Sequence, residues 1–204
     1  TGSLADADCI IIEGSNMAEN HPVGFRWVMK AKEKGATLIH VDPRFTRTSA
    51  VADIYAPIRT GSDIAFLGGL IRYVIENNKY FQEYVVNYTN IATIIEDDFK
   101  DASELDGLFS GWEAEKLSYN VDSWQYRGMD IPATLAEAYV HPSTEDPDKT
   151  IEKQQELTRR LPPSDPTLEN PKCVYQILKR HYALYTPEMV ERVTGCPKET
   201  FLKV

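Results

Sequence analysis

Two short polar loops carry the side chains in this sequence that are best suited to bind a ligand. The first is Asp42–Thr46, and the second is Pro57–Asp63. The carboxylate of Asp42 can accept hydrogen bonds from ribose hydroxyls, and the guanidinium of Arg44 can contact a phosphate through two N–H groups. Ser62-Asp63 opens a predicted helix whose free amides suit an anion. Together the two loops predict a nucleotide site.

The elements around these loops predict that they lie at one edge of a sheet. Thr37–Val41 is an apolar, β-branched run typical of a buried parallel strand, and Asp42 stands at its carboxyl end, where open α/β sheets bind ligands. A third loop, Gly14–Pro22, follows the strand Cys9–Glu13 and begins with a residue that accepts a positive φ. It lacks both G-x-G-x-x-G and the P-loop pattern, so an ordinary connection is the alternative.

The first 76 residues alternate strand and helix. After the Gly14–Pro22 loop comes a helix that ends at Gly35, with Val23, Trp27, Val28 and Ala31 predicted on its inner face. A short helical turn follows at Ser49–Ala52, then a short edge strand, Asp53–Ile58. The next helix is Asp63–Asn77, with an inner face predicted to consist of Ile64, Leu67, Leu70, Ile71 and Val74. This order predicts the α/β class, with a three-layer, Rossmann-like parallel sheet.

The later part of the chain is predicted as a long irregular insertion, residues 101–171, within a single α/β domain spanning 1–204. Short helices are expected before it at Tyr80–Tyr88 and Ile91–Asp98, and one inside it at Thr150–Arg160. Regular structure then returns. The expected elements are a helix Cys173–Tyr185 with Val174, Ile177, Leu178, His181 and Leu184 on one face, a helix capped by Thr186 and closed by Gly195, and a last helix that starts at Pro197.

Composition excludes several classes of function. The 204 residues include 22 Lys plus Arg against 31 Asp plus Glu, a net charge of −9, so a protein that follows nucleic-acid phosphates is excluded. The three cysteines are scattered without metal-ligand spacing, and Cys9 is expected in the core. The apolar runs are too short to span a membrane, and direct membrane insertion is not expected. The first strand begins almost at once, and we therefore expect a segment of a longer protein.

For the other polar residues, we predict structural roles. His21, which precedes a proline at a helix start, is expected to cap or pack, and His40 to be a packing residue. Arg47 is expected to cap a helix or to form a salt bridge, and Arg59 is predicted to pair with Asp42 or Asp53. These expectations leave the three loops as the candidate site.

Several motifs resemble the catalytic subunit of molybdenum- or tungsten-dependent formate dehydrogenases, within the dimethyl sulfoxide reductase family of molybdopterin oxidoreductases. The longest are Glu13–Trp27, Val41–Asp53 and Tyr55–Leu67, and shorter ones are Asp106–Gly111, Tyr185–Val190 and Thr194–Lys203. The likeness runs nearly from end to end. Within the formate dehydrogenases, the respiratory branch resembles this sequence most.

The resemblance implies a seat for a molybdopterin guanine dinucleotide. Carried over by position, Gly14, Ser15, Asn16, Glu19 and Asn20 line its pyrophosphate and pterin side, Asp42, Arg44 and Thr46 meet the guanosine ribose and phosphate, and Gly61, Ser62 and Asp63 meet the guanine end. The family's Cys or Sec metal ligand, its neighbouring histidine and its four-cysteine 4Fe-4S motif have no counterpart here. The resemblance therefore implies no catalytic or metal-ligating residue in this chain, which alone is expected to be inactive.

The resemblance also implies partners and leaves alternatives open. The partners are the remainder of the catalytic subunit and an iron–sulfur electron-transfer subunit, in the periplasm for the respiratory branch, with the cytoplasm as the alternative. A nitrate reductase of the same family shares the Ser15–Glu19 loop but usually not the Asp42–Thr48 form. A generic nucleotide- or NAD-binding module remains a rival, as does an interaction module using residues 101–171.

Overall fold

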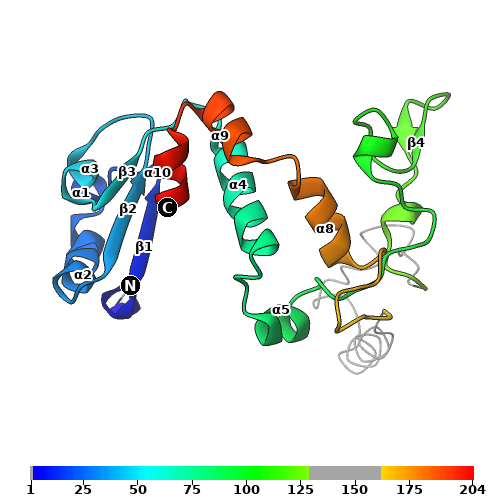
Figure 1. The fold of residues 1–204 in the computed structure, drawn as a ribbon, viewed down its shortest axis with the longest axis horizontal. Coiled ribbons are helices and arrows are strands. Elements are labelled where there is room, and N and C mark those ends of the chain that lie inside the picture. Colours follow the sequence, from blue (N-terminus) through cyan, green and yellow to red (C-terminus); the bar gives the residue numbers. More distant parts are fainter. Residues whose placement is uncertain (1, 129–161) are drawn as a thin grey trace, which may run out of the picture. The chain divides into compact units, whose positions relative to one another are not determined.

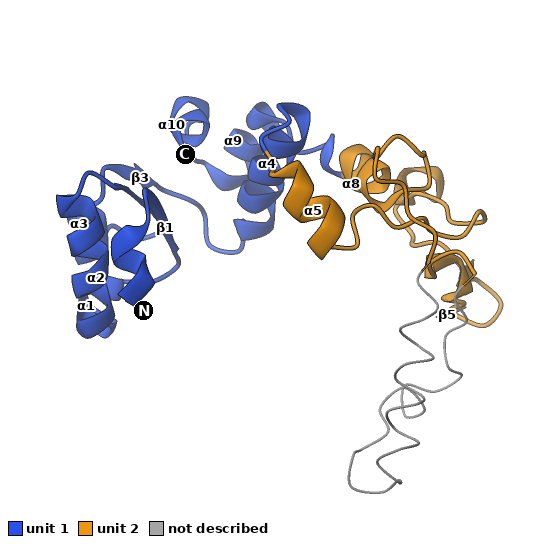
Figure 2. Cartoon of the chain, turned by 90° about the horizontal axis from the view of Figure 1, so that it is seen from below, with its two compact units in different colours: residues 1–79, 182–204 blue, residues 80–181 orange. Residues whose placement is uncertain are grey.

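The computed structural model describes residues 2–128 and 162–204, which fall into two compact units (Figure 2). Unit 1 comprises Thr1–Lys79 and Tyr182–Val204, and unit 2 comprises Tyr80–His181. The predicted insertion, residues 101–171, falls within the residue range of unit 2. The helix predicted at Thr150–Arg160 lies outside the described residues.

Unit 1 is built on a parallel sheet of three strands. These are β1 (Cys9–Glu13), β2 (Thr37–Val41) and β3 (Ile54–Ala56), in the order β1-β2-β3. Glu13 pairs with Val41, and Val41 with Ala56, so the three strands end at nearly the same level. The predicted α/β class and parallel sheet are confirmed. β3 is shorter than predicted because Pro57 has no N–H to extend the ladder.

Three helices cover one face of this sheet (Figure 1). They are α1 (Met17–Asn20), α2 (Pro22–Glu33) and α3 (Arg47–Val51), while the 3-10 helix η1 (Gly2–Asp6) packs on α2. The core on this face consists of Ile10, Ile12, Phe25, Val28, Ala31 and Leu38. Val23 was predicted inward, but it is 75% exposed and Phe25 is buried instead.

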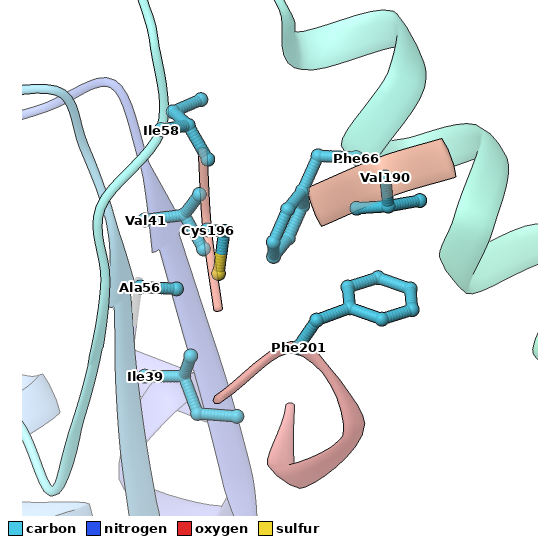
Figure 3. Close-up of a cluster of buried hydrophobic side chains, with 8 residues drawn as sticks. All are labelled: Ile39, Val41, Ala56, Ile58, Phe66, Val190, Cys196 and Phe201. Carbon is cyan, nitrogen blue, oxygen red and sulfur yellow. The ribbon is translucent and has the colours of Figure 1, made fainter. Parts of the chain in front are cut away.

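The other face is covered by α4 (Asp63–Glu76), α9 (Pro187–Thr194) and α10 (Lys198–Lys203). Their shared core is Ile39, Val41, Ala56, Ile58, Phe66, Val190, Cys196 and Phe201 (Figure 3). Local signals set the ends of α9 as predicted: Thr186 accepts a hydrogen bond from the Met189 amide, and Gly195 follows with φ +74°. The sheet is thus the middle of three layers.

The inner face of α4 differs from the prediction. Phe66 is fully buried, and the partly buried Leu70 packs against the same core, but Ile64, Leu67, Ile71 and Val74 are exposed. Two glycines decide the orientation. A Cβ atom on Gly69 would lie 2.5 Å from Val190 Cγ2, and one on Gly68 would lie 2.5 Å from the ring of Tyr185. These neighbours approach the helix backbone closely only because both positions lack a side chain.

Unit 2 contains little regular structure among its described residues. Its elements are α5 (Gln82–Tyr88), α8 (Val174–Tyr182), the strands β4 (Trp112–Glu113) and β5 (Ser118–Tyr119), and the 3-10 helices η2 (Ala102–Glu104) and η3 (Asp122–Trp124). α8 is shorter than predicted. Its buried residue is Tyr175, outside the predicted face, and Leu184 is 68% exposed.

The helix predicted at Ile91–Asp98 is wrong. Thr93, Ile94 and Ile95 instead form extended bridges to Ser164, Cys173 and Tyr126. Three consecutive β-branched residues favour this extended backbone because their side chains are restricted in a helix.

The cysteines and the apolar segments complete the fold. Cys9 was expected in the core but is exposed, since it lies at the start of an edge strand, whereas Cys173 and Cys196 are buried. Among the residues described, no helix has the length and apolar character needed to cross a membrane.

Candidate functional site

The structure brings the three predicted loops to one edge of the sheet. Gly14 follows β1 directly, Asp42 follows β2 directly, and the segment after β3 leads to Gly61 and the first residue of α4, Asp63. The carboxyl ends of parallel strands meet at the same edge, which is where open α/β sheets bind ligands. All of the site residues predicted from the sequence therefore lie on or beside this edge.

Hydrogen bonds join the loop after β1 to the end of β2 and to the segment that follows it. The amide of Gly14, at φ +64°, donates to the Val41 carbonyl over 2.9 Å. Thr48 Oγ1 donates to Asn16 Oδ1 over 3.2 Å and accepts from the Ala18 amide over 3.0 Å. The loop after β1 is therefore held in place by α3 and by the end of β2.

The polar side chains of α1 are largely engaged within the protein. The Asn16 amide group donates to the Glu19 carboxylate, which also pairs with Arg47 Nε at 3.2 Å. The salt bridge predicted for Arg47 is thus confirmed. Asn20 is exposed, and its backbone N–H donates to the backbone carbonyl of Asn16 over 3.0 Å. Asn16 and Glu19 organise this loop.

His40 connects all of these parts through a buried network. Its Nε2 lies 3.1 Å from the Ser15 carbonyl, which can only accept, so Nδ1 accepts from the Ser49 hydroxyl over 2.8 Å. Ser49 Oγ in turn accepts from the Thr46 amide over 2.8 Å and completes the cap of α3. Burial lowers the pKa of His40, against the smaller opposing effects of the Ser15 bond and the charge of Asp42. His40 is therefore neutral at pH 7.

This role of His40 was only partly visible in the sequence. Burial as a packing residue was predicted and is confirmed, because the side chain is fully buried. Its function as the bridge between two loops was missed. Ser49 lies nine positions away in sequence, and no motif links the two residues.

Asp42, the first residue of the Asp42–Thr46 loop, is nearly buried, with 8% of its surface exposed. Its Oδ1 accepts from the Arg44 amide over 2.7 Å, its carbonyl accepts from the Tyr55 hydroxyl over 2.9 Å, and its Oδ2 lies 3.8 Å from His40 Nε2. Tyr55 also meets Phe45 edge to face at 5.1 Å. The guanidinium of Arg44 makes no polar contact with any residue the structure describes.

The Pro57–Asp63 loop ends at the start of α4. Gly61 has φ +81°, and the Ser62 hydroxyl donates to the Arg59 carbonyl over 2.6 Å. The guanidinium of Arg59 donates to the carbonyls of Arg192 and Val193. Its predicted pairing with Asp42 or Asp53 is therefore wrong. The carbonyl groups at the end of α9 satisfy it instead.

Glu13 is a further candidate site residue, which was not predicted from the sequence. It ends β1, and its Oε1 atom is buried without a hydrogen-bond partner among the described residues. Burial raises the pKa of this carboxyl, and the negative charge of Asp63 raises it further. The available signal was the acidic residue directly before Gly14. The edge thus carries the carboxylates of Glu13, Asp42 and Asp63, and Arg44 follows Asp42 by two positions in the same loop.

This arrangement favours a ligand that offers several N–H or O–H donors together with an anionic group. Carboxylates accept hydrogen bonds, and arginine pairs with phosphate. The space in front of Gly14 and Gly61 is open, with no atom within 4 Å of a Cβ built there. Across residues 2–128 and 162–204, no group of three or more His, Cys, Asp or Glu side chains could hold a metal ion.

Comparison with known proteins identifies relatives of this chain. A family model described as molybdopterin oxidoreductase matches residues 1–158. The chain is 47% identical over 202 residues to the nitrate-inducible formate dehydrogenase major subunit of Escherichia coli K12. It is 44% identical over 201 residues to the formate dehydrogenase subunit alpha of Megalodesulfovibrio gigas. In both cases the match covers 98% of this chain but only 17% of the relative.

A solved structure supports the same fold. Acetylene hydratase from Pelobacter acetylenicus matches with a TM-score of 0.51 and 20% identity, covering 98% of this chain and 16% of that protein. At this identity the likeness concerns the fold alone. It supports the α/β architecture of the three-layer unit.

Proposed function

The chain belongs to the molybdopterin oxidoreductase family, and from this premise we propose that it is the part of a formate dehydrogenase catalytic subunit that seats a molybdopterin guanine dinucleotide. The observation that supports this proposal most is the convergence of three loops on the carboxyl edge of the sheet, joined by the His40 network. Relatives named as formate dehydrogenases, at 44–47% identity, support the choice of enzyme.

The residues present fit such a dinucleotide. Guanine, ribose and pterin all carry N–H or O–H donors, and the unpartnered Glu13 Oε1 atom, Asp42 Oδ2 and Asp63 can accept from them. Arg44 is the cation available for a phosphate. The open positions at Gly14 and Gly61 leave room for a ligand against the backbone.

The predicted site residues divide into two groups by what they already contact. Asn16, Glu19, Thr46 and Ser62 form internal hydrogen bonds, so we assign them to holding the loops in shape. Ser15 contributes its carbonyl to His40, and Asn20 is exposed. Direct contact with the cofactor is assigned to Gly14, Asp42, Arg44, Gly61 and Asp63, with Glu13 added to this group.

The larger activity is that of a full-length subunit, since this chain matches only 17% of the length of the relative from Escherichia coli. We propose that the subunit oxidises formate to carbon dioxide, with molybdenum or tungsten supplying the redox centre when bound. The metal ligand and a 4Fe-4S cluster would come from the remainder of the subunit. Electrons would pass to an iron–sulfur subunit, in the periplasm for a respiratory enzyme. The role of residues 1–204 is to bind and orient the dinucleotide.

Substitution of Asp42 in the full-length catalytic subunit tests this proposal. Asp42→Asn keeps the Oδ1 acceptor for the Arg44 amide and removes the negative charge. A hydrogen bond to a charged group contributes about 1.5–3 kcal/mol, so we expect cofactor affinity to fall about tenfold or more. The measurement is the guanine nucleotide released by acid from purified protein, per mole of subunit.

The matched control is Asp8→Asn. Asp8 is exposed just before β1, at the opposite edge of the sheet, so the same change there should leave nucleotide content unaltered. Full nucleotide content in the Asp42→Asn variant, with unchanged thermal stability, would mean that Asp42 only shapes its loop.

A further inference from the structure

Helix α4 has two apolar faces, and the three-layer unit uses only one of them. The inner face places Phe66 edge to face against Phe201 at 5.4 Å, with Val190 beside it (Figure 3). The outer stripe is defined by residues Ile64, Leu67, Ile71 and Val74, which are 76%, 43%, 38% and 36% exposed. Their spacing along the helix places them on one side.

A solvated helix has a different composition. The exposed positions of α2 include Arg26, Lys30 and Glu33, as expected for a face in contact with water. On α4 the charged residues after the first turn are Arg72 and Glu76, which pair with each other at 2.8 Å. A helix that is apolar nearly all round is normally buried on all sides, and a contiguous exposed apolar patch marks an interaction surface.

We propose that the outer stripe of α4 docks against an apolar surface of the same catalytic subunit, formed by polypeptide outside residues 1–204. The relatives are long enough to supply it, since this chain spans 17% of their length. A second copy of the chain is a poorer occupant, because it would bring another net charge of −9 to the contact. The inference requires family membership but does not depend on the cofactor role.

Photo-crosslinking in the full-length subunit identifies the occupant directly. We would place p-benzoyl-phenylalanine at Leu67 or at Ile71, irradiate the folded protein and map the crosslinked peptides by mass spectrometry. The expected products join the helix to peptides of the same polypeptide outside residues 1–204. The same amino acid at Glu33, on the exposed face of α2, is the control and should give few or no such products.

Three results would overturn the proposal: crosslinks confined to residues 1–204, a crosslinked dimer on a denaturing gel, or no crosslink at Leu67 and Ile71. Because a bulky residue can impair folding, a milder pair of variants gives an independent measurement. In the full-length subunit, Leu67→Cys should react with a maleimide at least tenfold more slowly than Glu33→Cys. Equal rates would place the stripe in solvent and contradict the proposal.

Discussion

The two faces of the sheet in unit 1 share the same strands but differ in chemistry. On β2, Leu38 and His40 point to the side of α1–α3, whereas Ile39 and Val41 point to the side of α4, α9 and α10. The first side ends, near the carboxyl edge of the sheet, in the polar network of His40. The second side is an apolar core that reaches the same edge through Val41.

This difference separates two tasks. The apolar face supplies stability through close packing, with aromatic and aliphatic side chains that contact one another directly. On the polar face, part of the apolar packing is replaced by hydrogen bonds, which fix the positions of the loops. Polar networks of this kind are costly when incomplete, so each member of the His40 network is expected to matter. The following predictions test the separation, from the largest effect to the smallest.

The largest effect is expected on the apolar face, at Phe66. Phe66→Ala removes a fully buried ring from the centre of that core, which should cost about 3–5 kcal/mol of unfolding free energy. Urea denaturation of the chain measures it. Phe45→Ala, at a ring that is 64% exposed beside the carboxyl edge of the sheet, is the matched control and should cost much less. Equal costs would refute the assignment of the core.

The next effect concerns the close contact of α4 with α9 and α10. In Gly69→Ala, the added Cβ would lie 2.5 Å from Val190 Cγ2 and 2.7 Å from Phe201 Cζ. Overpacking of this kind costs about 1–3 kcal/mol. That exceeds the gain of roughly 0.5–1 kcal/mol from replacing glycine in a helix. Thermal denaturation should therefore show a lower midpoint, and a higher midpoint would indicate looser packing than the structure shows.

On the polar face, His40 should make stability depend on pH. The pKa of His40 is lower in the folded state than the reference value of about 6.5 for the unfolded chain. The stability that the neutral ring contributes is therefore complete above about pH 6.5, and it is lost as the pH falls toward the folded-state pKa. His40→Gln should remove this dependence. It should also cost about 1–3 kcal/mol at neutral pH by disrupting the bonds to Ser15 and Ser49.

Denaturant midpoints of both proteins across the mildly acidic range provide the measurement. The unsubstituted chain should lose stability toward acid, and the variant should lose less. Parallel curves for the two proteins would show that His40 is not the titrating group.

The smallest effect is expected at Glu13. Its carboxyl pKa is raised by burial and by Asp63, so the charged form weakens the fold above the unfolded pKa and the protonated form does not. Glu13→Gln should therefore stabilise the unliganded chain at neutral pH, by about 0.5 kcal/mol for a partly solvated charge. The gain should vanish in acid. A stability loss at neutral pH would instead indicate a hidden partner for the carboxylate.

The strands and several helix ends were predictable because their signals are local. β-Branched runs marked β1 and β2 at the observed residues, and Thr186, Pro187 and Gly195 marked both ends of α9. Asp42, directly after a buried strand, predicted for the same reason the edge of the sheet at which the three loops meet. In a parallel sheet, position at a strand's carboxyl end is a property of the order of elements along the chain.

The sequence thus determined the order of elements and the edge at which the loops meet, whereas the tertiary structure decided which surfaces face inward. α4 is apolar on two sides, so periodicity could not choose between the stripe of Ile64 and Leu67 and the side of Phe66. The choice depended on Gly68 and Gly69, where the rings of Tyr185 and Phe201 approach from residues far along the chain. The roles of His40 and Glu13 depended likewise on neighbours that only the fold brings together, because burial and hydrogen-bond partners are properties of the packed molecule.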